Sequence, residues 1–555
     1  MQIRFRPRLV KKLLVVMALF FFGTITAQEE AWFYLRAKDS LTQPTFTSSG
    51  NQLKYTGNDS KLKRVLSRYQ IKTFKKTFRG AKKENLRKTF FVIANSEKML
   101  TDLLKETRHL FEFGEVIASK DKKIFEPNDY GLSSTIGDSK GFQVNLDYYD
   151  YLEVPKAWYY TTGSPDTKIG ISDGTVDSIS PDFKNKVTVF RKSTLSKGHG
   201  SGVASVAAAQ GDDGFGIPGI CYDCEIYATS YGSFLRLDQL MELSKAGARV
   251  INCSWIGSKY YQTAQDAVNE MFENGTVIVA GSGNRGYNET KGKVLYYPAS
   301  YDKVISVSAG MYKYERPEDN LKISKIGLYY GENIRGYISR TMHFRDRKLN
   351  TGPTDNFLES TGTLNEHVDM LAPTVGVLRY SKYVTEGRKD EYLTYQATST
   401  STPFISGTIG LMVSLNPCLP TKSIEPILKM TSYSIDHIDA NKRLKNLYGA
   451  GMVNTGRAVE MVYKLYTPSE VVTIENHGFS RWKFPVEALS EQVIFQNIAF
   501  TEAAELTMTA RNQIVLKPGT HLRPNSEGKT HLKINERLTK QCDLQLRDPS
   551  IVDKN

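Results

Sequence analysis

Short apolar segments alternate with helical stretches between about residues 155 and 465, and this alternation constrains the fold more than any other feature of the sequence. The apolar segments are dense in Val and Ile and are bounded by Gly, as in KIGISD, CEIYATS, ARVINCSW, TVIVAGSG and KVISVSA. This composition is typical of strands that are buried on both faces. The stretches between them, such as SFLRLDQLMELSKAG, have helical patterns. The alternation therefore predicts an α/β fold with a doubly wound, mostly parallel sheet.

The segments on either side of this region have different patterns, which bound the central domain at 126–465. Residues 28–125 hold the strand-like segments AWFYLRA, TFFVIA and EFGEVIAS and two helical segments, which predicts an N-terminal α+β domain of β-α-β-β-α-β order. Over 466–555 the helices stop, and short strands separated by turns predict a small C-terminal all-β domain. A charged, Tyr-rich insertion at about 311–350 is expected to form a long surface loop or a small hairpin.

The first 27 residues have the composition of an export signal. MQIRFRPRLVKK carries five basic residues and no acid, and the apolar run LLVVMALFFFGTITA that follows is short for a membrane span. Ala27 fits the last position of such a signal, and a membrane anchor is the alternative. No other long apolar run follows. We therefore expect a secreted protein (extracellular, cell-surface or periplasmic) with no membrane span once residues 1–27 are removed.

The formal net charge of +14 overstates the charge of the exported protein, because the signal's five basic residues account for part of it. Much of the remaining excess lies in residues 54–88. A nucleic-acid patch is one interpretation of such an excess. No nucleic-acid-binding module accompanies it, so we expect a solvated basic face and no nucleic-acid partner.

Five cysteines bear on metal binding and on the redox compartment. The pair Cys221 and Cys224 lacks two further zinc ligands at a usual spacing, so no metal site is predicted there. In an exported chain, a local disulfide between these two residues is the better expectation. Cys253 lies within the apolar segment VINCSW and is expected to be a buried thiol.

Three separate segments place an Asp, a His and a Ser where parallel sheets carry catalytic groups. Asp173 ends the strand KIGISD, at the carboxyl end where such groups gather. His199 opens GHGSGVASVAAA, a helix whose small residues allow close approach to a sheet. Ser399 lies in the hydroxyl-rich run QATSTSTPFISG at the start of a buried helix. A serine nucleophile needs a base, and the base needs an orienting acid. Each residue alone also fits a structural role, such as a turn Asp or a helix-terminal His.

Taken together, ISDGTVDSISPDF, GHGSGVASVAAA and ATSTSTPFISG resemble the Asp, His and Ser segments of the subtilisin-like serine peptidases, in the same chain order. The resemblance covers about residues 126–462. It implies the subtilisin-like fold, with Asp173, His199 and Ser399 as the catalytic triad.

The resemblance also assigns the groups around the nucleophile. Asn284, in TVIVAGSGNRG, resembles the family's oxyanion residue and would act with the backbone amide of Ser399. CSWIG resembles the strand that pairs with an extended peptide. The resemblance assigns substrate binding to Ser254, Trp255, Ile256, Gly257 and Gly283. Thr402 and Pro403 are expected in the first turn of the helix that follows Ser399.

The resemblance implies a secreted, monomeric endopeptidase that acts on protein or peptide substrates and needs no cofactor for its chemistry. Structural calcium is common in the family, but the sequence shows no acidic loop to assign to it. The domain at 28–125 resembles the family's propeptide, which would be a partner of the catalytic domain until a cut between about 120 and 140. A permanent N-terminal domain is the alternative.

Departures from the family pattern and two other functions also bear on the interpretation. Gly202 replaces a second His of the His segment, and Trp255 with Ile256 replaces a smaller pair, which leaves the preferred substrate side chain open. A catalytically silent binding or adhesion protein on the same scaffold would lack a catalytic group, whereas all four are present. An esterase on another fold would need a Gly-x-Ser-x-Gly turn, and Ser399 does not lie in one.

Overall fold

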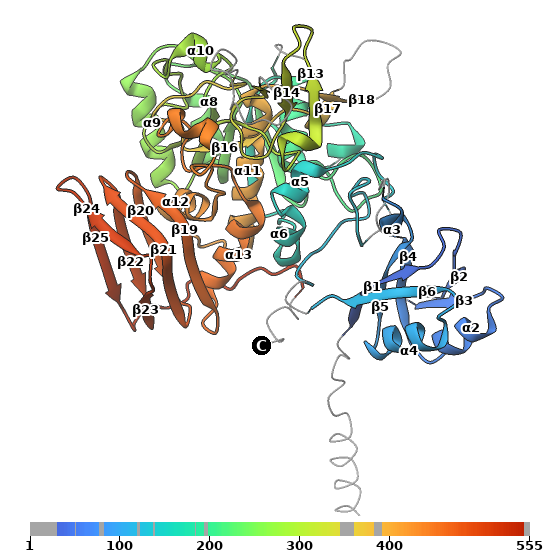
Figure 1. The fold of residues 1–555 in the computed structure, drawn as a ribbon. Helices are drawn as coiled ribbons and strands as arrows, with labels where there is room; N and C mark the ends of the chain where they lie inside the picture. The colour runs from blue at the N-terminus through green and yellow to red at the C-terminus, as the bar shows by residue number, and fades with distance from the viewer. Residues whose placement is uncertain are drawn as a thin grey trace, which may run out of the picture. The chain divides into compact units, whose positions relative to one another are not determined.

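The computed structural model describes residues 30–49, 52–76, 83–118, 122–136, 139–183, 185–193, 198–344, 360–381 and 391–548 (Figure 1). The chain divides into two compact units, Met1–Lys123 and Ile124–Asn555. The export signal predicted at 1–27 lies outside the described residues. Within the described ranges, every helix is too short or too polar to cross a membrane.

The N-terminal unit is an antiparallel sheet covered by two helices, as the sequence predicts. Alternate residues of its central strand are buried, and Phe33 and Leu35 pack against Leu62 and Met99 of the helices. The sheet order is β4 (Ile71–Lys76), β5 (Thr89–Ala94), β1 (Ala31–Ala37) and β6 (Phe111–Val116). The helices are α2 (Ser60–Leu66) and α4 (Lys98–Glu106), and β2 (Phe46–Ser49) pairs with β3 (Gln52–Tyr55) in a separate hairpin.

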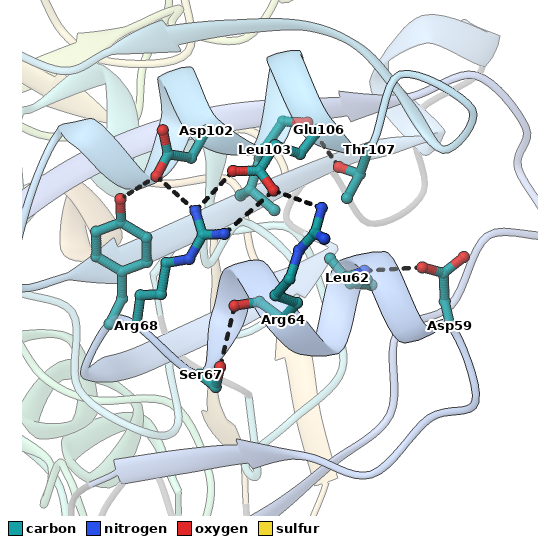
Figure 2. Close-up of polar contacts among 10 residues, drawn as sticks. Asp59, Leu62, Arg64, Ser67, Arg68, Asp102, Leu103, Glu106 and Thr107 are labelled. Atoms are coloured by element: carbon teal, nitrogen blue, oxygen red, sulfur yellow. Dashed lines mark hydrogen bonds and ion pairs between the residues drawn. The ribbon is translucent and has the colours of Figure 1, made fainter.

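Charged side chains connect α2 and α4 across the exposed side of this unit (Figure 2). Arg68 donates to Glu106 at 2.6 Å and to Asp102 at 3.3 Å, and Arg64 donates to Glu106 at 2.9 Å. The hydroxyl of Tyr69 donates to Asp102 at 2.6 Å, and burial together with this bond raises the pKa of Tyr69 to about 12. Exposed ion pairs add little stability, so the apolar contacts beneath them hold the two helices.

In the second unit, seven strands of the described chain form one parallel sheet. Their order is β16-β12-β11-β10-β7-β9-β8, and each neighbouring pair is parallel. This confirms the predicted doubly wound sheet. The strands are β7 (Lys168–Ser172), β8 (Val187–Val189), β9 (Glu225–Thr229), β10 (Ala248–Cys253), β11 (Val277–Gly281), β12 (Val304–Gly310) and β16 (Met370–Pro373).

Neighbouring residues of each strand point to opposite sides of the sheet. Because apolar residues occupy both sets of positions, both faces of the sheet are apolar. Val250 and Val279 belong to one core, whereas Ile251 and Ile278 belong to the other. The first core includes α7 (His199–Ala208), α11 (Thr398–Leu415) and α13 (Thr455–Tyr466). The second includes α8 (Asp238–Lys245) and α9 (Gln262–Glu273). A strand whose residues face the two cores in alternation is a continuous apolar run in the sequence.

The insertion predicted at about 311–350 is more ordered than a loop or a single hairpin. Its described part, up to residue 344, forms an antiparallel sheet of β13 (Leu321–Ile323), β14 (Tyr329–Glu332) and β15 (Thr341–Phe344). Ile334 and Ile338 are almost fully buried. Ile338 belongs to the same apolar cluster as Leu371 and Ile435, so it anchors the segment to the rest of the unit. The charged composition of the insertion conceals this contact.

The C-terminal strands stack in parallel and share a core with the central sheet's helices. Val472, Val493 and Ile514 lie in register on successive strands, and the buried Val472 and Val493 belong to the same core as α12 (Thr421–Thr431). One stack is β19 (Val471–Phe479), β21 (Gln492–Glu502), then β23 (Gln513–Leu516) and β24 (His521–Pro524). The other is β20 (Lys483–Ala488), β22 (Glu505–Ala510) and β25 (Lys529–Ile534). The strands are therefore not a freely hinged module.

A segment beyond β25 returns across the helices of the second unit. A disulfide joins Cys542 to Cys418, which lies between α11 and α12. Further along, the backbone amide of Gln545 donates to the Leu415 carbonyl at 2.8 Å, and that of Arg547 donates to the Tyr160 carbonyl at 2.7 Å. We call residues 540–548 the C-terminal strap.

Candidate active site

Asp173 and His199 form a hydrogen-bonded pair at the carboxyl edge of the central sheet. Asp173 follows β7 directly and is fully buried, and its Oδ1 lies 2.6 Å from Nδ1 of His199. A carboxylate accepts, so Nδ1 carries the proton and Nε2 of a neutral ring is left as an acceptor. The imidazole is therefore oriented with its basic nitrogen away from the carboxylate.

The small residues of α7 allow this close approach. His199 is the first residue of the helix, and nine residues after it, Gly200 to Ala208, are all buried. A side chain at Gly200 would overlap the backbone carbonyl oxygen of Gly174, the residue next to Asp173. Glycine at this position lets the helix start lie against the loop that carries the carboxylate.

Ser399 is the second residue of α11 and lies beside the end of β10. Its hydroxyl donates to the backbone carbonyl of Ser254 at 3.2 Å, and the Ser254 hydroxyl donates to the Ser399 carbonyl at 3.2 Å. Among the contacts of the described chain, no hydrogen bond joins Ser399 to His199. Ser399 therefore lies at the site, but its hydroxyl points to the carbonyl of Ser254, just after the end of β10.

Pro403 explains why the Ser399 carbonyl is free to accept that bond. The helix begins at Thr398, so Thr402 and Pro403 lie in its second turn, and the prediction that placed both in the first turn is wrong. Proline has no amide hydrogen and leaves the carbonyl four residues earlier without its helical partner. That carbonyl belongs to Ser399, and the Ser254 hydroxyl takes the place of the missing donor.

The side-chain amide of Asn284 is held by the same helix start. Its Oδ1 accepts from the backbone amide of Thr398 at 2.8 Å and from the Thr398 hydroxyl at 3.0 Å. With the oxygen fixed in this way, the Nδ2 donor is directed away from Thr398. Asn284 is exposed, so this donor faces solvent-accessible space next to Ser399.

The segment that follows β10 forms one wall of a cleft. Ser254 and Trp255 are buried, Ile256 is exposed, and Gly257 pairs with Tyr297 through bonds in both directions. A pocket of about 370 Å³ adjoins this segment and is lined mainly by aromatic and aliphatic side chains, among them Phe234, Trp255, Ile256, Tyr297 and Tyr301. Gly283 has φ +108 and packs against the ring of Tyr296, where a larger residue would clash.

The cysteines lie away from this reaction centre, except for one. Cys221 and Cys224 are joined by a disulfide, and Cys253 is a free, buried cysteine next to Ser254. Burial raises the pKa of the Cys253 thiol well above its ordinary value, and the nearby Asp173 carboxylate adds to this. The thiol is therefore neutral and unreactive.

The structure brings together the residues that the sequence singled out from distant segments: Asp173, His199, Ser399, Asn284 and the segment at 254–257 that follows β10. Sequence reasoning missed two residues of the site. One is Thr398, which holds the side chain of Asn284, and the other is Tyr231, whose hydroxyl lies 3.3 Å from Asp173 Oδ1. It also missed the disulfide between Cys418 and Cys542. Thr398 stands next to Ser399 in the quoted motif, whereas Tyr231 carries no signal in the sequence.

Comparison with known proteins gives a family-level match over this region. The family model described as the subtilase family matches residues 164–451. The thermophilic serine proteinase of Bacillus sp. (strain AK1) is 32% identical over 177 residues, which are 29% of this chain and 41% of that protein. Thermitase of Thermoactinomyces vulgaris is 28% identical over 277 residues, which are 47% of this chain and 80% of thermitase.

A solved structure gives a weaker match. The prenylagaramide maturation protease PagA is 20% identical, with a TM-score of 0.40, over 56% of this chain and 98% of that one. The chain spans less than half the length of the first two curated relatives, the Bacillus proteinase and the minor extracellular protease Epr of Bacillus subtilis.

Proposed function

The chain belongs to the subtilase family, and from this premise we propose that it is a secreted serine endopeptidase that acts through Asp173, His199 and Ser399. The observation that carries the proposal is the 2.6 Å contact between His199 Nδ1 and Asp173 Oδ1, with Ser399 supplied by the start of a neighbouring helix. This contact supports His199 as a base with a fixed tautomer, with Ser399 as the candidate nucleophile.

In the proposed acylation step, the Ser399 hydroxyl turns from the Ser254 carbonyl toward Nε2 of His199. The imidazole takes its proton as Oγ attacks the peptide carbonyl carbon, and Asp173 stabilises the imidazolium that forms. The imidazolium then gives this proton to the leaving amine as the C–N bond breaks. Water, deprotonated by His199, attacks the resulting ester. The bond between the acyl carbon and Oγ then breaks to release the new carboxylic acid, and the imidazolium returns its proton to Oγ, which restores Ser399 and neutral His199.

The oxyanion of each tetrahedral intermediate would accept from Nδ2 of Asn284 and from the backbone amide of Ser399. Thr398 holds Oδ1 of Asn284 through two donors, which leaves the Nδ2 donor in place before substrate arrives. A donor that is already oriented needs no reorganisation when charge develops on the oxygen, and this is the basis of its catalytic effect.

Protein or peptide substrates would bind as an added strand along Ser254, Trp255 and Ile256, with backbone hydrogen bonds that do not read side chains. The apolar pocket of about 370 Å³ beside Trp255 would take a large apolar substrate side chain. Gly283 would line the opposite side of the cleft. The chemistry needs no organic cofactor, and we propose that the enzyme acts as a monomer.

We also propose that the N-terminal unit is a propeptide that is removed after folding. The chain divides between Lys123 and Ile124, which supports a cut near this point. The Phe125 amide donates to the Pro155 carbonyl at 2.8 Å, so residues from 125 onward are already part of the second unit. The alternative, a permanent N-terminal domain, predicts an exported protein that keeps both units.

Structural calcium, which the family resemblance implies, is not assigned to any residues. In the ranges that the structure describes, no three His, Cys, Asp or Glu side chains are grouped to hold a metal ion. In Asp129 and Asp182, three of the four carboxylate oxygens are buried without a hydrogen-bond partner in the described chain. Burial raises the pKa of both to about 7, so we propose that protons balance these carboxylates.

The decisive experiment compares the wild type with Ser399→Ala on a casein substrate, a panel of peptides and a matched panel of esters. We expect Ser399→Ala to lose peptide hydrolysis and self-processing, the latter read by intact mass and N-terminal sequencing of the exported protein. Thr400→Val is the matched control, because the Thr400 hydroxyl is buried without a partner in the described chain.

Each other outcome points to a different function. Equal peptide cleavage by wild type and Ser399→Ala would overturn the assignment of the nucleophile. A wild type that binds peptides without cleaving them would favour the catalytically silent binding protein. Hydrolysis of esters but not of peptides would favour an esterase.

A further inference from the structure

Three donors converge on one oxygen of the buried Asp173 carboxylate. His199 Nδ1 lies 2.6 Å from Oδ1, the backbone amide of Gly174 donates to it at 2.5 Å, and the hydroxyl of Tyr231 donates to it at 3.3 Å. Oδ2 has no hydrogen-bond partner in the described part of the chain. Oδ1 therefore accepts hydrogen bonds from the Gly174 amide and the Tyr231 hydroxyl as well as from the imidazole, and these donors share its negative charge.

Tyr231 is held in place by its own loop. It is the second residue after the end of β9, and the side-chain amide of Gln239 donates to its backbone carbonyl. The next residue, Gly232, has φ +64, and a side chain there would overlap Gln239. The Tyr231 ring meets the ring of Trp255 edge-on, with centroids 6.4 Å apart and planes at 90°. These contacts fix the phenol between the cleft wall and the Asp173 carboxylate.

We propose that Tyr231 is a positioning residue that sets the basicity of His199 through Asp173. This inference rests on the proposed function. A hydrogen bond to Oδ1 removes negative charge from the atom that would stabilise the imidazolium, so it favours the neutral ring. With the Tyr231 hydroxyl present, Nε2 of His199 therefore stays unprotonated to a lower pH than it would without that hydroxyl. It acts through Asp173 and does not touch substrate atoms.

Other ionisable groups lie around this pair and stay unchanged in the test. Cys253 on β10 is buried beside Asp173, and on β17 (Leu378–Ser381) Arg379 lies against Gly202 of α7. Asp177 lies near the same helix, and its carboxylate accepts from the Tyr380 hydroxyl at 3.4 Å. Since wild type and variants share these groups, a difference between their titration curves reports the phenol.

The test is the pH dependence of kcat/KM for Tyr231→Phe, which removes the hydroxyl and keeps the ring on Trp255. We expect the acidic limb to move up by about half a pH unit, so that kcat/KM is about threefold lower at pH 6 and within about twofold of wild type at pH 9. A loss that is merely structural would lower kcat/KM by the same factor at every pH. Tyr227→Phe, on β9 and packed on Phe190, is the matched control and should leave the limb in place.

A second measurement does not depend on activity. In the Ser399→Ala background, the His199 ring protons are titrated by NMR with and without Tyr231→Phe, and we expect the His199 pKa to be higher in the double variant. Superimposable His199 titration curves would overturn this inference even if Ser399→Ala abolishes hydrolysis and so supports the proposed function. Conversely, a wild type without peptidase activity would refute the proposed function, while the NMR comparison would still test the role of Tyr231.

Discussion

Ser399 and Ser254 exchange hydrogen bonds in both directions, with each hydroxyl donating to the other's backbone carbonyl at 3.2 Å. The pair joins the start of α11 to the wall of the cleft. It exists because Pro403 leaves the Ser399 carbonyl without an amide donor from the helix. The first turn of α11 is therefore hydrogen-bonded to the segment after β10, which we propose binds substrate.

This relationship predicts a non-additive effect on stability. Ser254→Ala should lower the free energy of unfolding by about 1–3 kcal/mol, because it leaves the buried Ser399 carbonyl without a partner. Pro403→Ala supplies a helical amide to that carbonyl and should restore part of the loss in the double variant. Denaturant unfolding in the Ser399→Ala background, where self-digestion is excluded, measures both effects. Strictly additive changes would show that the two residues do not share this carbonyl.

The oxyanion assignment predicts a graded loss of turnover. Thr398→Val removes one of the two donors that hold Asn284 Oδ1, and we expect kcat to fall about tenfold with little change in KM, as for the loss of one neutral hydrogen bond. Asn284→Ala should cost about 100- to 1,000-fold in kcat, the range known for one oxyanion-hole donor in a related protease. Steady-state kinetics beside Thr400→Val checks both. Wild-type kcat in Asn284→Ala would refute the assignment.

The main parts of the site were predictable because they follow from chain direction. Parallel strands end at one edge of a sheet, so Asp173 after β7 and Asn284 just after β11 had to lie near each other. The small residues after His199 showed that its helix packs closely. The contact of Tyr231 with Asp173 depends on the turn at Gly232 and on Gln239, and no periodicity in the sequence encodes it.

The C-terminal region shows the same limit at the level of the fold. Alternation in segments such as EVVTIENHGF predicts strands, but it does not tell parallel from antiparallel neighbours. The parallel stacks pair residues about 21 positions apart, as Val472 and Val493 do, and this spacing was not recognised in the sequence. Pro403 was placed one turn too early, since its position depends on Ala397 being extended and Thr398 starting the helix.

Buried carboxylates predict a stability that falls as pH rises from about 4 to about 7. Burial raises the pKa of Asp129 and of Asp182 to about 7, well above the value of an unfolded Asp, about 3.9. Between these values the folded state binds more protons than the unfolded chain, so the free energy of unfolding decreases with rising pH. Each group contributes a slope of up to about 1.4 kcal/mol per pH unit between pH 4 and 7.

Asp182→Asn tests this dependence, because it keeps the shape of the side chain and removes the charge. Its melting temperature should change less with pH between 4 and 8 than that of the wild type, whereas Asp266→Asn, at an exposed acid, should match the wild type. The scans are run with chelator and with calcium. A calcium-dependent rise in the melting temperature that is lost in Asp182→Asn would contradict the prediction, by showing that a cation and not a proton balances these carboxylates.

The disulfide between Cys418 and Cys542 predicts that the C-terminal strap stabilises the second unit without taking part in catalysis. It closes a loop across a sequence separation of 124 residues, and the loss of such a link raises the entropy of the unfolded chain. We expect Cys542→Ser to lower the free energy of unfolding by about 2–5 kcal/mol. The bonds of Gln545 and Arg547 to the carbonyls of Leu415 and Tyr160 should then open more readily.

Calorimetry and limited proteolysis of the strap measure these effects. We expect kcat to stay within about twofold of wild type, because the strap bonds to Leu415, at the opposite end of α11 from Ser399, and to Tyr160. The double variant Cys418→Ser with Cys542→Ser should match the single variant, since both lose the same covalent link. Asp543→Ser, at the exposed neighbouring residue, is the control and should leave the melting temperature unchanged. A Cys542→Ser protein with wild-type stability and an equally protected strap would show that the noncovalent contacts alone hold the segment.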